Sequence, residues 1–362
     1  AFLKIGISKS FIVMKIYKDL FNRIISLENL VLAWEEFRSD KGKKLDVQEF
    51  EFSLEKNIFS LHRDLVTKKY THGPYTGFYI RDPKVRHIHK ATVRDRVLHH
   101  AVFRILNPIF EETFIPNSFS CRIGKGSHKG VLAAEVMLRK ESRNYTVPCY
   151  ALKCDVRKFF DSIDHGILLD ILKKRIVDPD TVWLLQQIVW SFTGGWKTLF
   201  EHLGVPIGNL TSQLFANVYM NEFDQFVKQK LKIKHYARYT DDFLVVSTNK
   251  KYLEDLIDPI QKFLSERLKL SLHPKKVSIR ICGKGVDFLG YVILPHYRLL
   301  RSKTKHRIFR KLKYRVAQYR EGVIDEHSLS QSLQSYLGAL SHADTFQLSE
   351  DLKNQYWYWI HE

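Results

Sequence analysis

Three aspartates of this sequence stand where apolar runs end, which is an unusual setting for ionised side chains. Asp155 follows the run 150–154, and Asp241 and Asp242 join two further runs. Carboxylates avoid such surroundings because the desolvation of their charge is costly. Three strand-end carboxylates can bind two Mg²⁺ ions roughly 3.5–4 Å apart, and this arrangement promotes phosphoryl displacement. The alternative for an isolated Asp-Asp pair is a simple acidic turn.

The runs around these aspartates predict the elements that position them. Alternating faces along a strand allow two adjacent aspartates to reach one site only at a tight turn, so we expect a β-hairpin with an acidic tip over 235–247. A strand is expected at 150–154, followed by a polar turn and a helix that begins near Ile163. A helix is expected over 214–231, before the hairpin.

The rest of the chain alternates helical and strand-like periodicity. Hydrophobic spacing predicts two helices between Tyr17 and Tyr70 and a basic hairpin over 75–89. The further expected elements are a helix at 94–110, a helix at 253–268, a hairpin at 286–294 and a basic helical segment from Lys303 onward. A chain of this length predicts two or three subdomains.

The composition indicates a polyanionic partner. The 362 residues include 58 Lys and Arg against 39 Asp and Glu, a formal charge of +19. Such a surface binds nucleic acid without sequence preference because each neutralised phosphate releases counterions.

No stretch approaches the roughly 18 apolar residues of a spanning helix, so we expect no membrane partner. The four cysteines form no CxxC pair, so we expect neither a zinc site nor a disulfide framework, and a reducing cytosol fits best.

Seven blocks of the sequence, taken together, resemble the reverse transcriptases. Tyr239-Thr240-Asp241-Asp242 resembles their YxDD box, and Asp155 to Asp164 resembles the preceding palm motif. The other blocks, in chain order, are Lys84–Ile88 with Asp95–Val97, Ser118–Arg122, Gly204–Gln213, Leu272–Lys276 and Phe288–Tyr291. The resemblance implies an α+β right-hand polymerase with fingers, an antiparallel-sheet palm and a helical thumb.

The resemblance also implies domain boundaries and an RNA-directed DNA polymerase activity. The implied domains are an N-terminal helical extension at 1–70, fingers at 71–149, a palm at 150–298 with inserted fingers-like helices near 165–200, and a thumb at 299–362. Template RNA, cDNA and dNTPs are the implied partners and substrates, and two Mg²⁺ ions the implied cofactors.

Each site residue is carried over from the matching block. Asp155, Val156, Asp241 and Asp242 are the implied metal ligands, and Lys276 is the implied proton donor to the departing pyrophosphate. The implied nucleotide-binding residues are Lys84, Arg86, Phe160, Ile207, Gly208 and Gln213, with Phe160 as the gate against a ribose 2′-hydroxyl. The implied primer grip is Phe288, Leu289, Gly290 and Tyr291. The purely structural alternatives are a solvated surface charge for Arg86 and core packing for Phe160 and for the primer-grip block.

One loop narrows the subfamily. Many reverse transcriptases carry Gln-Gly and then Ser-Pro where this sequence has Ile207-Gly208 and Ser212-Gln213. This version resembles the reverse transcriptases of diversity-generating retroelements, which copy a template RNA with frequent errors at adenines. The resemblance implies a small basic accessory variability protein that forms a ring, and a cytoplasmic location in a bacterial, archaeal or phage-infected cell. Because Ile207 removes a hydrogen-bonding amide near the nucleotide, low fidelity is the expected consequence.

Other functions stay open at this point. Retron, abortive-infection and intron-type reverse transcriptases share the same blocks, although Ser212-Gln213 disfavours retrons. The sequence ends at Glu362, soon after the expected thumb, so we expect no DNA-binding or nuclease domain of the intron type. A non-enzymatic RNA-binding scaffold with a palm fold is the alternative from another functional class, and the presence of all three carboxylates argues against it.

Overall fold

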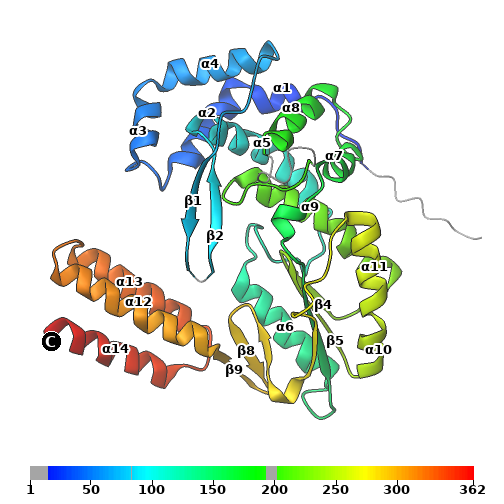
Figure 1. The fold of residues 1–362 in the computed structure, drawn as a ribbon, viewed down its shortest axis with the longest axis vertical. Helices are drawn as coiled ribbons and strands as arrows, with labels where there is room; N and C mark the ends of the chain where they lie inside the picture. Colours follow the sequence, from blue (N-terminus) through cyan, green and yellow to red (C-terminus); the bar gives the residue numbers. More distant parts are fainter. Residues whose placement is uncertain (1–14, 83, 193–201) are drawn as a thin grey trace, which may run out of the picture. The chain divides into compact units, whose positions relative to one another are not determined.

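The computed structural model describes residues 15–82, 84–192 and 202–362, which divide between two compact units. The first unit comprises Ala1–Phe114 and Lys158–Glu222, and the second comprises Ile115–Arg157 and Phe223–Glu362. Both units combine α-helices with antiparallel β-strands (Figure 1). The three strand-end aspartates all belong to the second unit. The fingers, palm and thumb boundaries stay a prediction.

The first unit is mainly helical. Its elements are α1 (Phe21–Ile25), α2 (Leu27–Arg38), α3 (Leu45–Phe52), α4 (Leu54–Val66), β1 (Thr76–Ile80), β2 (Arg86–Lys90), α5 (Val93–Glu111), α7 (His165–Lys173), α8 (Pro179–Trp190) and most of α9 (Leu210–Gln225). Strands β1 and β2 form the expected basic hairpin. Part of the expected helical insertion near 165–200 corresponds to α7 and α8, and its segment 193–200 lies outside the described residues.

The expectation of two helices between Tyr17 and Tyr70 is wrong, because the structure has four. Ser26 separates α1 from α2, since its side chain accepts a hydrogen bond from the Asn29 amide at 3.2 Å and caps the new helix. Such local bonds compete with helix continuation. Ser53 separates α3 from α4 without a capping side-chain bond, and its own amide donates to the Glu51 carbonyl at the end of α3.

The second unit is built on a four-stranded antiparallel sheet in the order β4-β5-β3-β6. The strands are β3 (Tyr150–Asp155), β4 (Tyr236–Tyr239), β5 (Asp242–Ser247) and β6 (Ser278–Ile281). Helix α6 (Ser127–Glu141) lies on one face, and α10 (Lys250–Asp255) and α11 (Ile257–Leu268) lie on the other (Figure 1). Alternate residues of each strand therefore contribute to two apolar layers.

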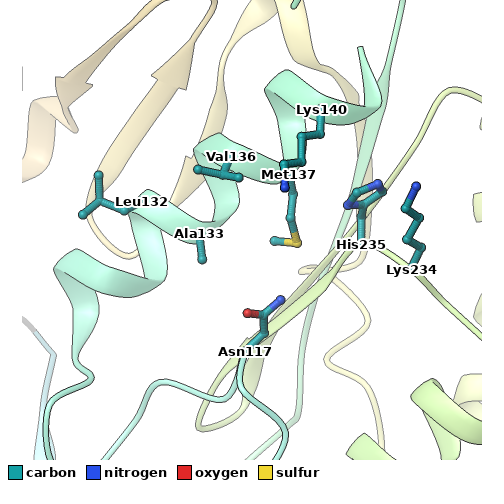
Figure 2. Close-up of a pocket in the computed structure, with 8 residues that line it drawn as sticks. All are labelled: Asn117, Leu132, Ala133, Val136, Met137, Lys140, Lys234 and His235. Carbon is teal, nitrogen blue, oxygen red and sulfur yellow. The ribbon is translucent and has the colours of Figure 1, made fainter. Parts of the chain in front are cut away.

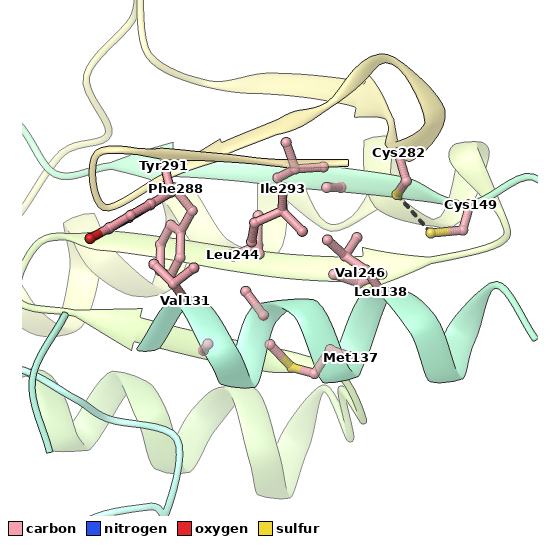
Figure 3. Close-up of a cluster of buried hydrophobic side chains, with 14 of the residues drawn as sticks. Val131, Met137, Leu138, Cys149, Leu244, Val246, Cys282, Phe288, Tyr291 and Ile293 are labelled. Atoms are coloured by element: carbon pink, nitrogen blue, oxygen red, sulfur yellow. Dashed lines mark hydrogen bonds between the residues drawn. The ribbon is translucent and has the colours of Figure 1, made fainter. Parts of the chain in front are cut away.

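The α6 face of this sheet carries one buried core (Figure 3). Ala151 of β3 and Leu244 and Val246 of β5 pack there against Val131 and Leu138 of α6. A second sheet, in the order β7-β8-β9, adds to this core; its strands are β7 (Val286–Phe288), β8 (Tyr291–Leu294) and β9 (Tyr297–Leu300). The expected hairpin at 286–294 is thus present, extended by a third strand.

Two other helix predictions need correction. The single helix expected over 253–268 is two helices, because Pro259 near the start of α11 lacks the amide that would continue α10. The helix expected over 214–231 begins earlier, at Leu210, and its last part, Phe226–Lys230, winds as a wider π-helix.

Three helices follow β9 at the C-terminal end. They are α12 (Ser302–Arg320), α13 (Glu326–Leu340) and α14 (Phe346–His361), which pack side by side (Figure 1). Their own apolar core contains Ile308, Leu312, Val316, Leu329, Leu340, Leu352 and Trp359. Among the helices of the described ranges, none has the length and apolar character to cross a membrane.

Candidate active site

The register of the central sheet brings two of the three aspartates together. Strands β3 and β5 run antiparallel, with Asp155 directly opposite Asp242 at the end of the ladder. Opposed residues of paired strands project from the same face with Cβ atoms roughly 4.5–5.5 Å apart. A pair of carboxylates in this position repels, and a nearby cation relieves the repulsion.

The third aspartate lies in the turn that joins β4 to β5. Tyr239 pairs with Asp242, so Thr240 and Asp241 form a two-residue turn. Asp242 is therefore the first residue of β5, and the acidic tip predicted for the hairpin holds Asp241 alone. Thr240 has a φ of +55°, which is uncommon for a β-branched residue, and its hydroxyl donates to the Ser120 hydroxyl at 2.6 Å.

A buried ion pair between Arg238 and Asp224 stabilises this turn. Arg238 donates two hydrogen bonds to Asp224, at 2.8 and 2.6 Å, and both side chains are fully buried. The same guanidinium donates to the Thr240 carbonyl and to the Ser118 hydroxyl, each at 3.1 Å. Tyr236 donates to Asp224 at 2.7 Å. Arg238 thus connects the turn that contains Asp241 to helix α9 and to the segment before α6.

The three carboxylates create an excess of negative charge. Burial, followed by the charges of Asp242 and Asp155, raises the pKa of Asp241 to about 6. Burial also raises the pKa of Asp242, against the opposing effect of Lys153. The ammonium of Lys276 lies 2.7 Å from a carboxylate oxygen of Asp155. In the part of the chain that the structure describes, Lys276 is thus the one cation in direct contact with any of these three carboxylates, and it contacts Asp155.

This charge and donor chemistry suits Mg²⁺, which prefers hard oxygen ligands. Within the described ranges, however, no group of three or more His, Cys, Asp or Glu side chains is arranged so that it could hold a metal ion. Lys276 contacts Asp155 where a bound cation would compete with it. Val156, the fourth predicted ligand, is buried and its amide donates to the Asp241 carbonyl at 3.1 Å. Metal binding by these residues stays a prediction.

We expect Asp241→Asn to raise the free energy of unfolding at pH 8 by about 1–3 kcal/mol. The pKa of Asp241 is about 6 in the folded protein against an ordinary 3.8, so the folded state binds more protons between these values. Wild-type stability therefore falls as pH rises through this window, whereas the asparagine variant escapes that loss. Urea unfolding with a chelator near pH 4 and pH 8 measures the effect, and equal stabilities near pH 8 would contradict it.

The sequence matches, over residues 80–293, the model of a family described as "Reverse transcriptase (RNA-dependent DNA polymerase)". The matched region is more than half of the chain and contains all three aspartates. The chain belongs to the reverse transcriptase family. The match confirms the predicted α+β fold of the right-hand polymerase type, with its helices and antiparallel sheets.

Similar curated proteins include two from bacteria. Protein YkfC of Escherichia coli (strain K12) is 25% identical, over 68% of this chain and 72% of YkfC. Group II intron-encoded protein LtrA of Lactococcus lactis subsp. cremoris is 23% identical, over 80% of this chain but only 58% of LtrA. Among solved structures, an apo telomerase from Candida tropicalis, truncated from its C-terminal domain, is 13% identical with a TM-score of 0.46, over 67% of this chain and 59% of that chain.

The residues expected to bind the nucleotide in this reverse transcriptase lie in the first unit. Lys84 and Arg86 are exposed at the β1–β2 hairpin. The Ile207 carbonyl accepts from the His89 amide at 3.1 Å, so its loop is bonded to β2. Gly208 has a φ of +115°, and a Cβ there would lie 2.8 Å from a methyl group of Ile88. Glycine is therefore required at this position.

Two other members of that set are partly buried. Phe160 lies in a 3₁₀ turn, and its carbonyl accepts from the Val205 amide at 2.9 Å, which joins the turn to the loop at 204–208. Gln213 lies in the first turn of α9. The structure thus brings the Phe160, Ile207 and β2 segments together within the first unit.

The predicted primer grip is a tight turn in the second unit. Phe288 pairs with Tyr291 across β7 and β8, and Leu289 and Gly290 between them have φ values of +49° and +92°. Phe288 is fully buried in the core shared with α6, which agrees with core packing for that residue. The Tyr291 hydroxyl donates to the Ala339 carbonyl of α13 at 3.2 Å.

Sequence reasoning missed the residues that support the acidic turn. Arg238 stood inside a run read as an apolar strand, next to the YxDD box. An arginine within an apolar strand is costly to bury without a partner of opposite charge. The sequence could therefore have indicated a buried ion pair at this position. Its partner Asp224 lies 14 residues away on a helix, and Ser118 and Ser120 lie some 120 residues from their partners Arg238 and Thr240. Only the fold identifies these contacts.

A separate cavity of about 380 Å³ lies beside α6 in the second unit (Figure 2). It is lined by Asn117, Leu132, Ala133, Val136, Met137, Lys140, Lys234 and His235. His235 faces Glu141 at 3.2 Å. The cavity contains none of the predicted site residues, so it is not the candidate active site.

Proposed function

We propose that this chain is an RNA-directed DNA polymerase that extends cDNA on a template RNA. The observation that carries the proposal is the pairing of Asp155 with Asp242, beside Asp241 in the adjoining turn, within the region that matches the family. The formal charge of +19 suits a nucleic-acid duplex as partner.

In the proposed reaction, Asp155, Val156, Asp241 and Asp242 would hold two Mg²⁺ ions. Bound Mg²⁺ supplies positive charge that stabilises the attacking and leaving oxygens of phosphoryl transfer. Lys276 neutralises Asp155 in the resting protein, where the two groups lie 2.7 Å apart. Once released from that contact, its ammonium can donate a proton to the departing pyrophosphate.

The first unit supplies the proposed nucleotide contacts. Lys84 and Arg86 are exposed cations suited to a triphosphate. Phe160 blocks a ribose 2′-hydroxyl, and Ile207, Gly208 and Gln213 line the nucleotide and template. The backbone bond between Ile207 and His89 supports this grouping, because it positions the loop against the strand that carries Arg86.

We further propose the finer assignment to a diversity-generating retroelement, with errors opposite template adenines and a ring-forming basic accessory protein as partner. The Ile207-Gly208 and Ser212-Gln213 sequence supports it. The likeness to LtrA, described as a group II intron-encoded protein, favours an intron-type reverse transcriptase as the second candidate. Both candidates share the same polymerase chemistry and differ in template and fidelity.

Incorporation of dNTPs on a primed RNA template with Mg²⁺, followed by sequencing of the cDNA, tests both levels of the proposal. Extension with errors concentrated opposite adenines would support the retroelement assignment. Extension with errors spread evenly would retain the polymerase and favour the intron-type candidate. No extension, even with cognate RNA and accessory protein, would reject the polymerase in favour of an RNA-binding scaffold.

We expect Ile207→Gln to lower the misincorporation frequency opposite template adenine by roughly 3- to 10-fold. A glutamine amide adds a hydrogen-bonding group near the nucleotide, and a site with more such bonds discriminates better. Ile207→Leu is the matched control, because it keeps the apolar character and volume. If the glutamine and leucine variants show the wild-type error spectrum, Ile207 only fills space.

A further inference from the structure

Two buried cysteines of the second unit face each other across β3 and β6. The Sγ atoms of Cys149 and Cys282 lie 2.7 Å apart (Figure 3). Only 2% and 4% of these residues are exposed. Cys149 directly precedes β3, and Cys282 directly follows β6.

The contact between the two cysteines follows from the pairing register of β3 and β6. Tyr150 pairs with Ile281, so Cys149 and Cys282 form the next opposed pair of the ladder. The Cys282 amide donates to the Cys149 carbonyl at 2.9 Å, which extends the backbone pairing to the cysteines. Hydrogen-bonded antiparallel pairs have Cα atoms roughly 5.5 Å apart, inside the range of roughly 4.4–6.8 Å that a disulfide requires.

The other two cysteines provide a contrast. Cys121 is exposed, and Cys154 is buried, with a pKa raised to about 12 by burial. Cys149 differs, because the hydrogen bond with Cys282 lowers its pKa. A more acidic thiol with a second sulfur in contact is the arrangement in which disulfides form readily.

We propose that Cys149 and Cys282 are a redox modification site that forms a reversible disulfide joining β3 to β6. The oxidant is a hydroperoxide. The Cys149 thiolate attacks the peroxide oxygen to give a sulfenic acid and an alcohol, or water from hydrogen peroxide. Cys282 then displaces the hydroxyl as water and completes the S–S bond. Two thiols thus lose two electrons and two protons to one peroxide, and a dithiol reductant reverses the step.

The disulfide would affect the strand that stands at the edge of the sheet. Among the described residues, strand β6 pairs with β3 and with no other strand, so its outer side is open to fraying. Asp155 contacts Lys276 near the far end of the same strand pair. The disulfide would link β3 covalently to the C-terminal end of β6, so β6 could no longer separate from β3 at that end. The segment between Lys276 and β6 would become less mobile as a result.

The test treats the full chain, carrying Cys121→Ser to prevent links between molecules, with hydrogen peroxide. We expect the mass of the intact protein to fall by two hydrogens and a proteolytic peptide to join Cys149 to Cys282. Oxidation should raise Tm by about 5 °C or more, because the link closes a long loop. Amide exchange in β6 should become slower, and dithiothreitol should reverse all three changes.

Matched variants separate the disulfide from other oxidation. Cys149→Ser and Cys282→Ser, each in the Cys121→Ser background, should lose the linked peptide, the Tm shift and the slower exchange. Cys154→Ser should retain them. Recovery of only sulfinic or sulfonic acids, or of a folded protein whose two thiols stay reduced, would overturn the proposal. None of these readouts depends on polymerase activity.

Discussion

Replacing Asp241 and Asp242 together by asparagine will lower dNTP incorporation by roughly 10³-fold or more. Both carboxylates belong to the grouped, partly buried set that includes Asp155, and burial already raises the pKa of each. Asparagine keeps the shape but removes the negative charge on which the proposed cation binding depends. Primer extension at matched protein concentration measures the loss.

The control for this experiment is Asp258→Asn, which removes an exposed carboxylate from α11 of the same unit. It should extend primers at the wild-type rate. The double variant should stay folded, because Asp241→Asn relieves charge repulsion. If the double variant were inactive because it is unfolded, the loss of activity would say nothing about catalysis. Urea unfolding of the same protein therefore accompanies the assay. A folded double variant with wild-type extension would contradict the assignment.

Removal of the buried guanidinium in Arg238→Met will cost about 3–5 kcal/mol of stability and most of the activity. Asp224 would remain as a buried charge without its ion-pair partner, and the carbonyl of Thr240 would lose its donor. Because Thr240 has a positive φ, its conformation depends on such contacts. Chemical denaturation and primer extension measure the two effects separately.

Arg238→Lys separates stability from positioning. Lysine retains the positive charge beside Asp224 but cannot donate to Asp224, Ser118 and Thr240 in the fork geometry of arginine. We expect it to recover part of the stability and little of kcat. Arg280→Met, an exposed arginine on β6, is the control and should change neither quantity. Full recovery of kcat with lysine would show that Arg238 acts through charge alone.

The hairpin that carries Asp241 and Asp242 was predictable because its signals are local. An acidic turn between two apolar runs predicts a hairpin, and the structure places that hairpin at β4 and β5. The pattern did not predict that Asp242 belongs to β5, opposite Asp155. That detail depends on the register of β3 against β5, a contact between segments far apart in the sequence.

The boundaries of the helices were less predictable from the sequence than the positions of the strands. Four N-terminal helices replaced the expected two, and α10 and α11 replaced a single helix. In each case apolar residues occur on both sides of the break, while a single polar or proline residue changes the backbone. Ser26 and Pro259 show how one hydrogen bond gained or lost interrupts a helix whose apolar face continues.

The sequence by itself determined the chemistry of this protein: its basic charge, its strand-end aspartates and its family are all properties of residue type and order. The tertiary structure alone decided which groups meet. Asp155 reaches Asp242 through strand pairing, Arg238 reaches Asp224 through burial, and Cys149 reaches Cys282 through the register of β6. The physical reason is that local propensity acts over a few residues, whereas strand pairing and burial join residues that are 14 to 133 positions apart in the sequence.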